Sequence, residues 1–235
     1  TFCQAFVLPA GATTDVERFG HVYSAGSHHM VLYRTALAVS EALALANPVA
    51  CASAFQFGVT GIAYAAQLPA GEMRFPPSVA MRFGSEEVLV METHYLNTGA
   101  AIDAEVRVNL WFPAARATTE AGALFFYDPV IVVPANGTST AQMQCEIPSD
   151  VMLLSAASHM HRRGVGYRSS LSGGSLPAPL SLFETTDWDN VALWPFDPPI
   201  ATTAGQRIDY AGDYRTDTAQ TIIEGPSAEF DEMCM

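Results

Sequence analysis

The clearest strand signal in the sequence is EEVLVMETHY, residues 86–95. Its alternation places Val90, Glu92 and His94 on one face of an extended strand. Comparable runs that favour β-branched or aromatic residues recur at short intervals along the chain. They are Ala5–Leu8, His28–Tyr33, Phe55–Tyr64, Val88–Tyr95, Glu105–Phe112, Phe125–Val133, Val151–His161, Tyr167–Leu171, Leu180–Phe183 and Thr221–Glu224.

Turn residues separate these runs, in the pattern of a β-sandwich or jelly roll rather than of βαβ units. The turn signals are Pro9–Gly11, Gly84–Ser85, Asn97–Gly99, Pro134–Gly137, Ser172–Ser175 and Pro198–Pro199. The Ala/Leu-rich segment Thr35–Ala46 is the one good helical candidate. A boundary is expected after Trp111-Phe112-Pro113, which gives domains 1–113 and 114–235.

Composition excludes several classes of protein. The 235 residues are 49% apolar and 15% charged, so the chain can bury a sizeable core and is not a disordered protein. Eleven basic and twenty-four acidic residues give a formal charge of -13, which repels nucleic acid and anionic lipid. No apolar run approaches the roughly 20 residues that a membrane helix needs, so no membrane span is expected.

The start of the chain and its cysteines point to an oxidising compartment. Thr1-Phe2-Cys3 lacks an initiator Met and a signal peptide, which indicates a processed or trimmed chain. The four cysteines, at positions 3, 51, 145 and 234, form no Cys-x-x-Cys motif. Their even number and wide spacing suit disulfides in a secreted protein, while buried free thiols explain them equally well.

Five of the six histidines fall in three strand-like motifs, which is the most informative feature of the sequence. In Ser158-His159-Met160-His161 the two imidazoles lie two residues apart, so a strand would project both from one face, close enough to share a metal ion. Two half-buried polar residues on one strand face give the same pattern. Taken alone, the motif does not decide between a metal site and that plainer interpretation.

His28 and His29 pose a different geometric problem, because neighbours on a regular strand point to opposite faces. Both can bind one ion only at a strand end or a bulge, and the preceding Gly26-Ser27 makes such an irregularity believable. The plainer alternative is one buried and one exposed histidine. For His94, the alternative to a metal ligand is a structural histidine whose ring is hydrogen-bonded within the sheet. Histidine as the donor favours late first-row metals over calcium or magnesium.

The order of these motifs resembles the copper type II, ascorbate-dependent monooxygenases, which include the peptidylglycine α-hydroxylating and dopamine β-monooxygenases. The resemblance runs in register over nearly the whole chain and ends with Asp231-Glu232-Met233-Cys234. Between the motifs the sequence is much less similar. The resemblance implies two tandem antiparallel β-sandwich domains, each with one copper ion.

Carried over residue by residue, the resemblance implies two unlike sites. The electron-transfer copper in the first domain would be held by His28, His29 and His94. The oxygen-binding copper in the second domain would be held by the catalytic residues His159, His161 and Met233, although Met235 offers a second sulfur. A thioether favours Cu(I), the state that meets dioxygen.

The chemistry implied is hydroxylation of a substrate C–H bond by O2, with one electron delivered through each copper by ascorbate or a similar donor. Glu92 is either a residue that orients the first site or a plain surface carboxylate. A non-catalytic copper carrier of the same fold is the main alternative to the enzyme. A structural β-sandwich module ranks last, because it needs three separate coincidences.

The sequence departs from the family in three places. The peptide-amidating enzymes have a substrate-binding arginine two residues before the His-x-His pair, and Ala157 stands there, which argues against a glycine-extended peptide as substrate. The family's substrate-contacting tyrosine lies beyond Met235. Several family cysteines are absent, so Cys3–Cys51 and Cys145–Cys234 are the economical pairing.

Two further motifs have local interpretations. Asn136-Gly137-Thr138 matches a glycosylation acceptor, but a turn is preferred. Arg162 and Arg163 either steer an anionic substrate or donor, or belong to a solvated loop, and the loop is preferred.

Overall fold

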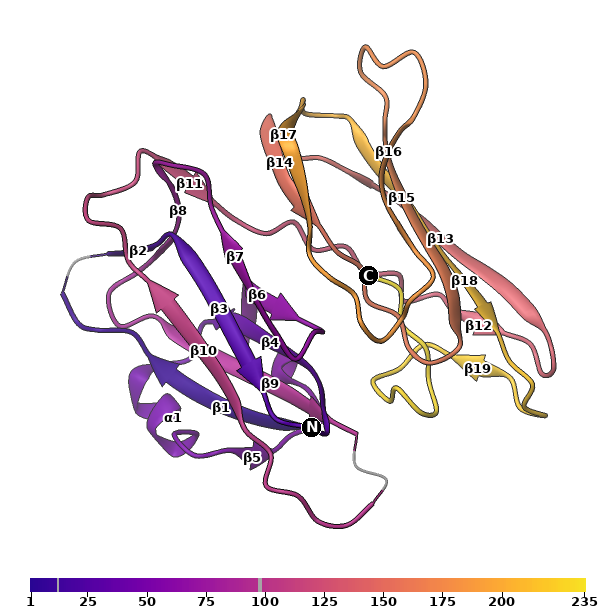
Figure 1. Ribbon diagram of the computed structural model, residues 1–235, viewed down its shortest axis with the longest axis horizontal. Helices are drawn as coiled ribbons and strands as arrows, with labels where there is room; N and C mark the ends of the chain where they lie inside the picture. Colours follow the sequence, from indigo (N-terminus) through magenta and orange to yellow (C-terminus); the bar gives the residue numbers. More distant parts are fainter. Residues whose placement is uncertain (12, 97–98) are drawn as a thin grey trace. The chain divides into compact units, whose positions relative to one another are not determined.

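The computed structural model describes residues 1–11, 13–96 and 99–235, and within them the protein is almost entirely β. The chain divides into unit 1, Thr1–Phe125, and unit 2, Phe126–Met235 (Figure 1). The predicted all-β class is confirmed. The division follows Phe125 rather than Pro113, because Thr119–Ala121 pairs with a strand of unit 1 and so belongs to it.

Unit 1 contains one five-stranded sheet and two three-stranded sheets. The five-stranded sheet has the order β5-β1-β9-β4-β6, with β1 (Phe2–Val7), β4 (Ser27–Thr35), β5 (Val49–Ala50), β6 (Val59–Ala66) and β9 (Val88–Tyr95). The other two have the orders β10-β3-β7 and β11-β8-β2, with β2 (Thr14–Val16), β3 (Arg18–Tyr23), β7 (Ala70–Arg74), β8 (Val79–Phe83), β10 (Val106–Trp111) and β11 (Thr119–Ala121).

Both faces of the two strands β4 and β9 in this sheet are largely buried. Leu89 and Met91 of β9 join a core with Phe19 and Phe83 from the smaller sheets. The alternate residues of β9 pack with Cys3 and with the short helices α1 (Val39–Ala44) and η1 (Ala54–Phe57). Burial on two sides explains the nearly continuous apolar run in β9, since each fully buried side chain of this size contributes roughly 1.5–3 kcal/mol.

The predicted helix Thr35–Ala46 is shorter in the structure, where only Val39–Ala44 is α-helical. Thr35 instead ends β4, and its hydroxyl donates to the Val88 carbonyl on β9 at 2.9 Å. The helix begins where the Glu41 carboxylate accepts the backbone N–H of Ala38 at 2.8 Å. Sheet pairing therefore overrides helix propensity at the first residues of this segment.

Unit 2 contains a four-stranded sheet of order β13-β18-β15-β16 and two strand pairs. Its strands are β12 (Val132–Val133), β13 (Thr138–Glu146), β14 (Val151–Ala156), β15 (Gly164–Ser172), β16 (Leu180–Thr185), β17 (Trp194–Thr202), β18 (Arg207–Arg215) and β19 (Ile222–Ile223). β14 pairs with β17, and β12 pairs with β19. The core includes Tyr214, Leu171 and Ile147, all of which are almost fully buried.

Several predicted boundaries in unit 2 are wrong. The strand predicted for Val151–His161 ends at Ala156, and the one predicted for Phe125–Val133 is reduced to β12. Pro198-Pro199, predicted as a turn, lies inside β17. Strand β17 pairs only with β14 in this sheet, so its other edge can accommodate prolines that have no N–H to donate. The turn at Asn136 is confirmed, with φ at 50°.

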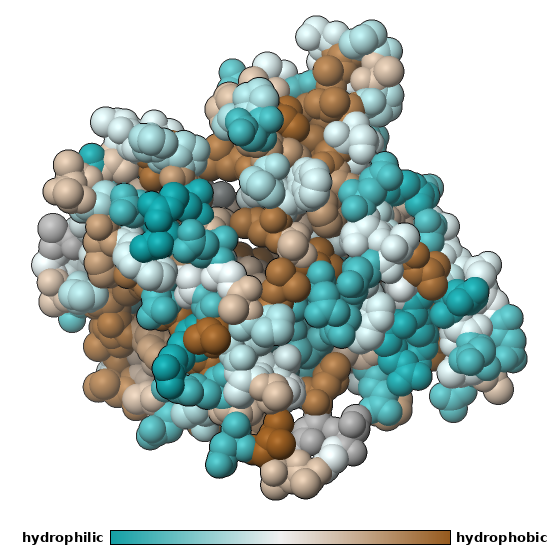
Figure 2. Space-filling view, in the orientation of Figure 1, coloured by the Kyte–Doolittle hydropathy of each residue, from teal (hydrophilic) through white to brown (hydrophobic). Residues whose placement is uncertain are grey.

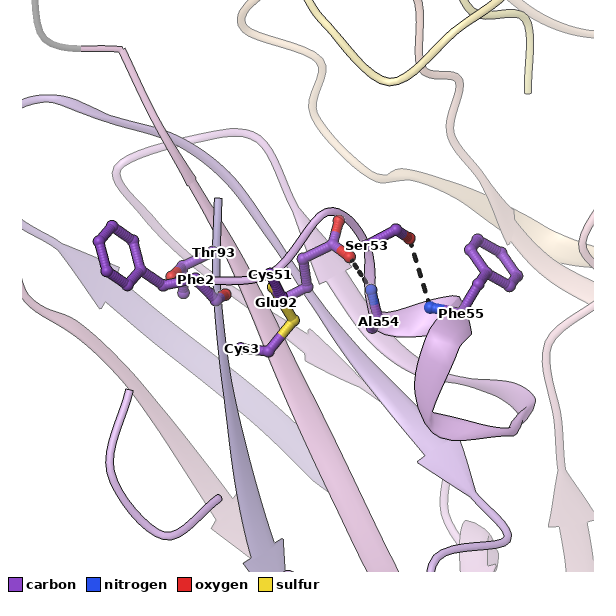
Figure 3. Close-up of a disulfide and its surroundings, with 8 residues drawn as sticks. All are labelled: Phe2, Cys3, Cys51, Ser53, Ala54, Phe55, Glu92 and Thr93. Atoms are coloured by element: carbon purple, nitrogen blue, oxygen red, sulfur yellow. Dashed lines mark hydrogen bonds between the residues drawn. A yellow bond between two sulfur atoms is a disulfide. The ribbon is translucent and has the colours of Figure 1, made fainter. Parts of the chain in front are cut away.

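One of the two expected disulfides is present. Cys3 and Cys51 are bonded, and the bridge links β1 to the segment that precedes η1 (Figure 3). The expected Cys145–Cys234 bond is absent, and both residues are free thiols. Each thiol lies beside a different tyrosine hydroxyl, Tyr210 for Cys145 and Tyr214 for Cys234. Burial raises the pKa of Cys234 to about 11, so this thiol stays protonated near neutral pH.

Removing the disulfide by the double substitution Cys3→Ala/Cys51→Ala is expected to destabilise unit 1. The cysteines are 48 residues apart, and closing a loop of that length is worth about 4 kcal/mol in the entropy of the unfolded chain. Urea unfolding followed by the near-ultraviolet signal measures the change. Cys145→Ala is the control and should cost much less. A double variant as stable as the control would show that the bridge contributes little.

None of the helices among the described residues is long and apolar enough to span a membrane. Hydrophilic and hydrophobic side chains are interspersed on the surface in view (Figure 2).

Candidate metal centres

A bulge in β4 creates the first histidine cluster. Opposite β9, Ser27 pairs with Tyr95 and His29 pairs with His94, so that β4 carries one extra residue, His28, between the two pairs. Gly26, just before the bulge, has φ at +87°, and a Cβ there would lie 2.3 Å from a carbon of Ile102. The irregularity that the sequence required for adjacent histidines is therefore confirmed, and glycine permits it.

The bulge brings three imidazoles of unit 1 together. Ring centroids are 5.0 Å apart for His28 and His29, 5.0 Å for His29 and His94, and 5.7 Å for His28 and His94. Imidazoles that share one ion through bonds of about 2 Å have their centroids about 5 Å apart. His28 and His29 are buried, whereas His94 is half-buried, so the cluster lies at the margin of the core.

The rings are close together but not yet arranged around an ion. Across residues 1–11, 13–96 and 99–235, no set of three or more His, Cys, Asp and Glu side chains already has the arrangement of a metal site. The spacing and donor type fit a late first-row metal, and three imidazoles suit copper or zinc.

Glu92 has a role that neither sequence interpretation anticipated. Its carboxylate accepts the backbone N–H of Ala54 at 2.5 Å and so caps the first turn of η1 beside the disulfide (Figure 3). Ser53 also hydrogen-bonds to this carboxylate, and burial raises the pKa of Glu92. Glu92 thus fastens the Cys51–η1 segment to β9, two residues from His94, and is not a plain surface carboxylate.

His21, the histidine outside the three motifs, is a structural residue. Its Nδ1 lies 2.7 Å from the Tyr64 hydroxyl and its Nε2 lies 2.9 Å from the Leu68 carbonyl. A carbonyl can only accept, so Nε2–H donates to it and Nδ1 accepts from Tyr64. Burial lowers the pKa of His21, which keeps the ring neutral.

The second cluster lies in unit 2, after β14. His159 and His161 have ring centroids 5.3 Å apart, which fits two imidazoles on one ion. The intervening Met160 is fully buried in the core of unit 2. The two histidines therefore share a face, as predicted, although they lie outside a regular strand.

The C-terminal segment pairs with this His-x-His stretch. The N–H of His159 donates to the Met235 carbonyl at 3.2 Å, and the N–H of Met235 donates to the His159 carbonyl at 3.1 Å. Met160 and Cys234 form the next antiparallel pair, and both are fully buried. Because faces alternate, Met235 lies on the histidine face directly opposite His159, where Cβ atoms are about 5 Å apart.

Met233 is placed on the same face by the same alternation, one step further along. Regular pairing stops before it, because the N–H of His161 donates at 3.2 Å to the side chain of Glu232. The Met233 carbonyl accepts from the buried Tyr214 hydroxyl at 2.6 Å. Both thioethers are therefore candidate ligands beside the two imidazoles, and the backbone register alone does not select between them.

A buried ion pair that sequence analysis missed supports this cluster. Glu232 is fully buried, and its carboxylate lies 3.5 Å from the guanidinium of Arg163, which is buried as well. The preferred interpretation of Arg163 as part of a solvated loop is therefore wrong, whereas Arg162 is exposed. Burial raises the pKa of Glu232 to about 7. No spacing rule signals such a pair, because charged residues are usually at the surface.

The backbone also fixes the protonation of His161. Its Nδ1 lies 3.1 Å from the Asp231 carbonyl, so Nδ1 carries the hydrogen and Nε2 carries the lone pair. Metal-bound histidines commonly donate their other ring N–H to a carbonyl in this way. Two imidazoles with thioether sulfur are a donor set that suits copper, especially Cu(I).

No model of a known protein family matches the sequence, and no curated protein matches it significantly.

Proposed function

We propose that the chain is a copper-dependent monooxygenase that binds two copper ions and hydroxylates a C–H bond of an organic substrate. The overall reaction would be R–H + O2 + 2 e⁻ + 2 H⁺ → R–OH + H2O, with a one-electron donor such as ascorbate supplying the electrons. The first copper would bind in unit 1 through His28, His29 and His94. The second would bind in unit 2 through His159, His161 and a methionine, which the resemblance identifies as Met233.

One observation carries the proposal: the bulge in β4 that puts His28 and His29 on one side, opposite His94. A strand that needs its histidines only for packing gains nothing from this irregularity, which costs one ladder hydrogen bond. Two adjacent imidazoles that must reach the same ion do need it. The three histidine motifs of the sequence thus form two compact groups, one in unit 1 and one in unit 2.

The two donor sets would give the ions different properties. Bound copper supplies one-electron redox chemistry and the activation of dioxygen. Three imidazoles in unit 1 would hold a copper that can adopt both oxidation states, whereas the thioether in unit 2 would favour the reduced ion. The chain's own part is to hold the imidazoles in position and to fix which ring nitrogen of His161 carries its proton.

The disulfide suits a location outside the cytoplasm, because such bonds persist in oxidising compartments. The proposed partners are accordingly a small organic substrate, O2 and a soluble electron donor. The -13 charge disfavours nucleic acid as a partner.

A copper carrier of the same fold is the second candidate function. Its supporting observation is Ala157, an exposed residue at the position where the peptide-amidating enzymes have a substrate-binding arginine. A carrier must release its copper readily, whereas the enzyme must retain two unlike ions.

Oxygen uptake by the copper-loaded, desalted protein with ascorbate, screened over small organic compounds as the substrate R–H, tests the proposal. Ascorbate-dependent uptake should be seen in the native chain and should fall at least tenfold in both His29→Ala and His159→Ala, because each lacks one site. The variant His21→Gln, which alters a histidine outside both clusters, should retain uptake. The carrier would be supported instead if the native chain showed no oxygen uptake and passed both copper ions rapidly to a Cu(I) chelator.

A further inference from the structure

The carboxylate of Glu232 occupies a place in unit 2 where a charge would ordinarily be costly. It is fully buried, and it accepts the backbone N–H of His161 at 3.2 Å and that of Arg163 at 2.9 Å. The guanidinium of Arg163 balances the charge at 3.5 Å. Burying an ion pair rarely adds stability by itself, so stability alone does not explain why Glu232 and Arg163 are buried together.

The hydrogen bonds of Glu232 shape the turn that carries His161. A regular antiparallel ladder would send the N–H of His161 to the carbonyl of Met233, but the carboxylate takes this N–H instead. The chain then turns back, with the N–H of Gly164 donating to the His161 carbonyl at 2.9 Å. The pairing with the C-terminal segment thus ends at His161.

The segment that carries Glu232 is itself held in place on both sides. The backbone N–H of Glu232 donates to the Ile223 carbonyl at 3.0 Å, and the backbone carbonyl of Glu232 accepts the N–H of Gly225 at 3.1 Å. Arg163 donates through Nη2 to the Glu229 carbonyl at 2.9 Å and so closes the loop before Glu232. Asp231, the preceding residue, presents the carbonyl that binds Nδ1 of His161.

We propose that Glu232, with Arg163, is the positioning residue of the second metal cluster: it locks the His161 backbone so that the Asp231 carbonyl holds Nδ1–H and Nε2 is directed to the ion. The proposal rests on the proposed function in that the ion is copper. The hydrogen bonds themselves involve only protein groups and can be tested without metal.

The substitution Glu232→Gln changes the hydrogen bonds that residue 232 can accept without changing the size of its side chain. Glutamine keeps the shape, but it offers one carbonyl oxygen where the carboxylate offers two, so one of the two backbone N–H groups faces an NH2 group. Glu229→Gln is the matched control: it removes the same charge three residues away from an exposed side chain, and its carbonyl contact with Arg163 remains.

The first readout is the tautomer of His161 in the metal-free protein, from two-dimensional ¹⁵N–¹H correlation of the imidazole ring. The native chain and Glu229→Gln should show the hydrogen on Nδ1, and Glu232→Gln should show a mixture of both tautomers. A native His161 with the hydrogen on Nε2 would overturn the proposal, and this measurement remains decisive even if Glu232→Gln does not fold.

The second readout is copper affinity at each site by competition with a chelator. Glu232→Gln should weaken the unit 2 site by about 10- to 100-fold, as expected for loss of a group that orients a ligand, and leave the unit 1 site unchanged. Unchanged affinity together with an unchanged tautomer would overturn the positioning role. A native chain that binds no copper in unit 2 but has the expected tautomer would refute the proposed function and leave the positioning of His161 intact.

Discussion

Replacing His29 by alanine is expected to lower the copper content from two ions per chain to one. His29 is central to the unit 1 cluster, since its ring lies 5.0 Å from both His28 and His94. Loss of a group that merely orients a ligand costs 10- to 100-fold in affinity, so loss of a ligand should cost roughly 100-fold or more. Metal analysis after desalting measures the ratio.

The control for this prediction is His21→Gln, in the same unit. His21 is also buried but is hydrogen-bonded to Tyr64 and Leu68, so its replacement should reduce stability and leave two coppers bound. Equal copper loss in both variants would mean that the content follows the folding of unit 1 rather than a ligand set.

Replacing Met233 by leucine is expected to weaken Cu(I) binding in unit 2 by about 10- to 100-fold, with a smaller effect on Cu(II). Leucine has nearly the same volume, so packing changes little while the soft sulfur donor is lost. Titration with a coloured Cu(I) chelator, compared with Cu(II) competition, measures both effects.

Met235→Leu is the matched variant for that experiment. The resemblance predicts Met233 as the ligand, so Met235→Leu should leave Cu(I) affinity nearly unchanged. Met235 nevertheless lies directly opposite His159 in the backbone pairing. The reverse result would assign the sulfur to Met235, and no effect from either variant would refute a thioether ligand in unit 2.

The unit 1 cluster could be anticipated from sequence because its constraint is local. Adjacent histidines cannot share an ion on a regular strand, and Gly26-Ser27 marked the place where regularity fails. The strand around His94 was equally clear, since β9 begins with the apolar run Val88–Met91, whose residues are buried on both faces. The spacing of the apolar residues and the position of the turn residues were sufficient to predict this part of unit 1.

Unit 2 was harder because its cluster depends on contacts distant in the chain. His159 and His161 follow a strand that ends at Ala156, and their shared face depends on pairing with residues 234–235. Glu232 and Arg163 are 69 residues apart, and their ion pair is invisible to any local pattern. The Cys145–Cys234 pairing failed for the same reason, because sequence spacing does not report distance in space.

Copper stoichiometry of the reconstituted, desalted native chain tests whether each unit binds one metal ion. Two coppers per chain are expected, one of which is lost in His29→Ala and the other in His159→Ala. One copper that both variants abolish, or no copper at all, would contradict the assignment of one metal site to each unit.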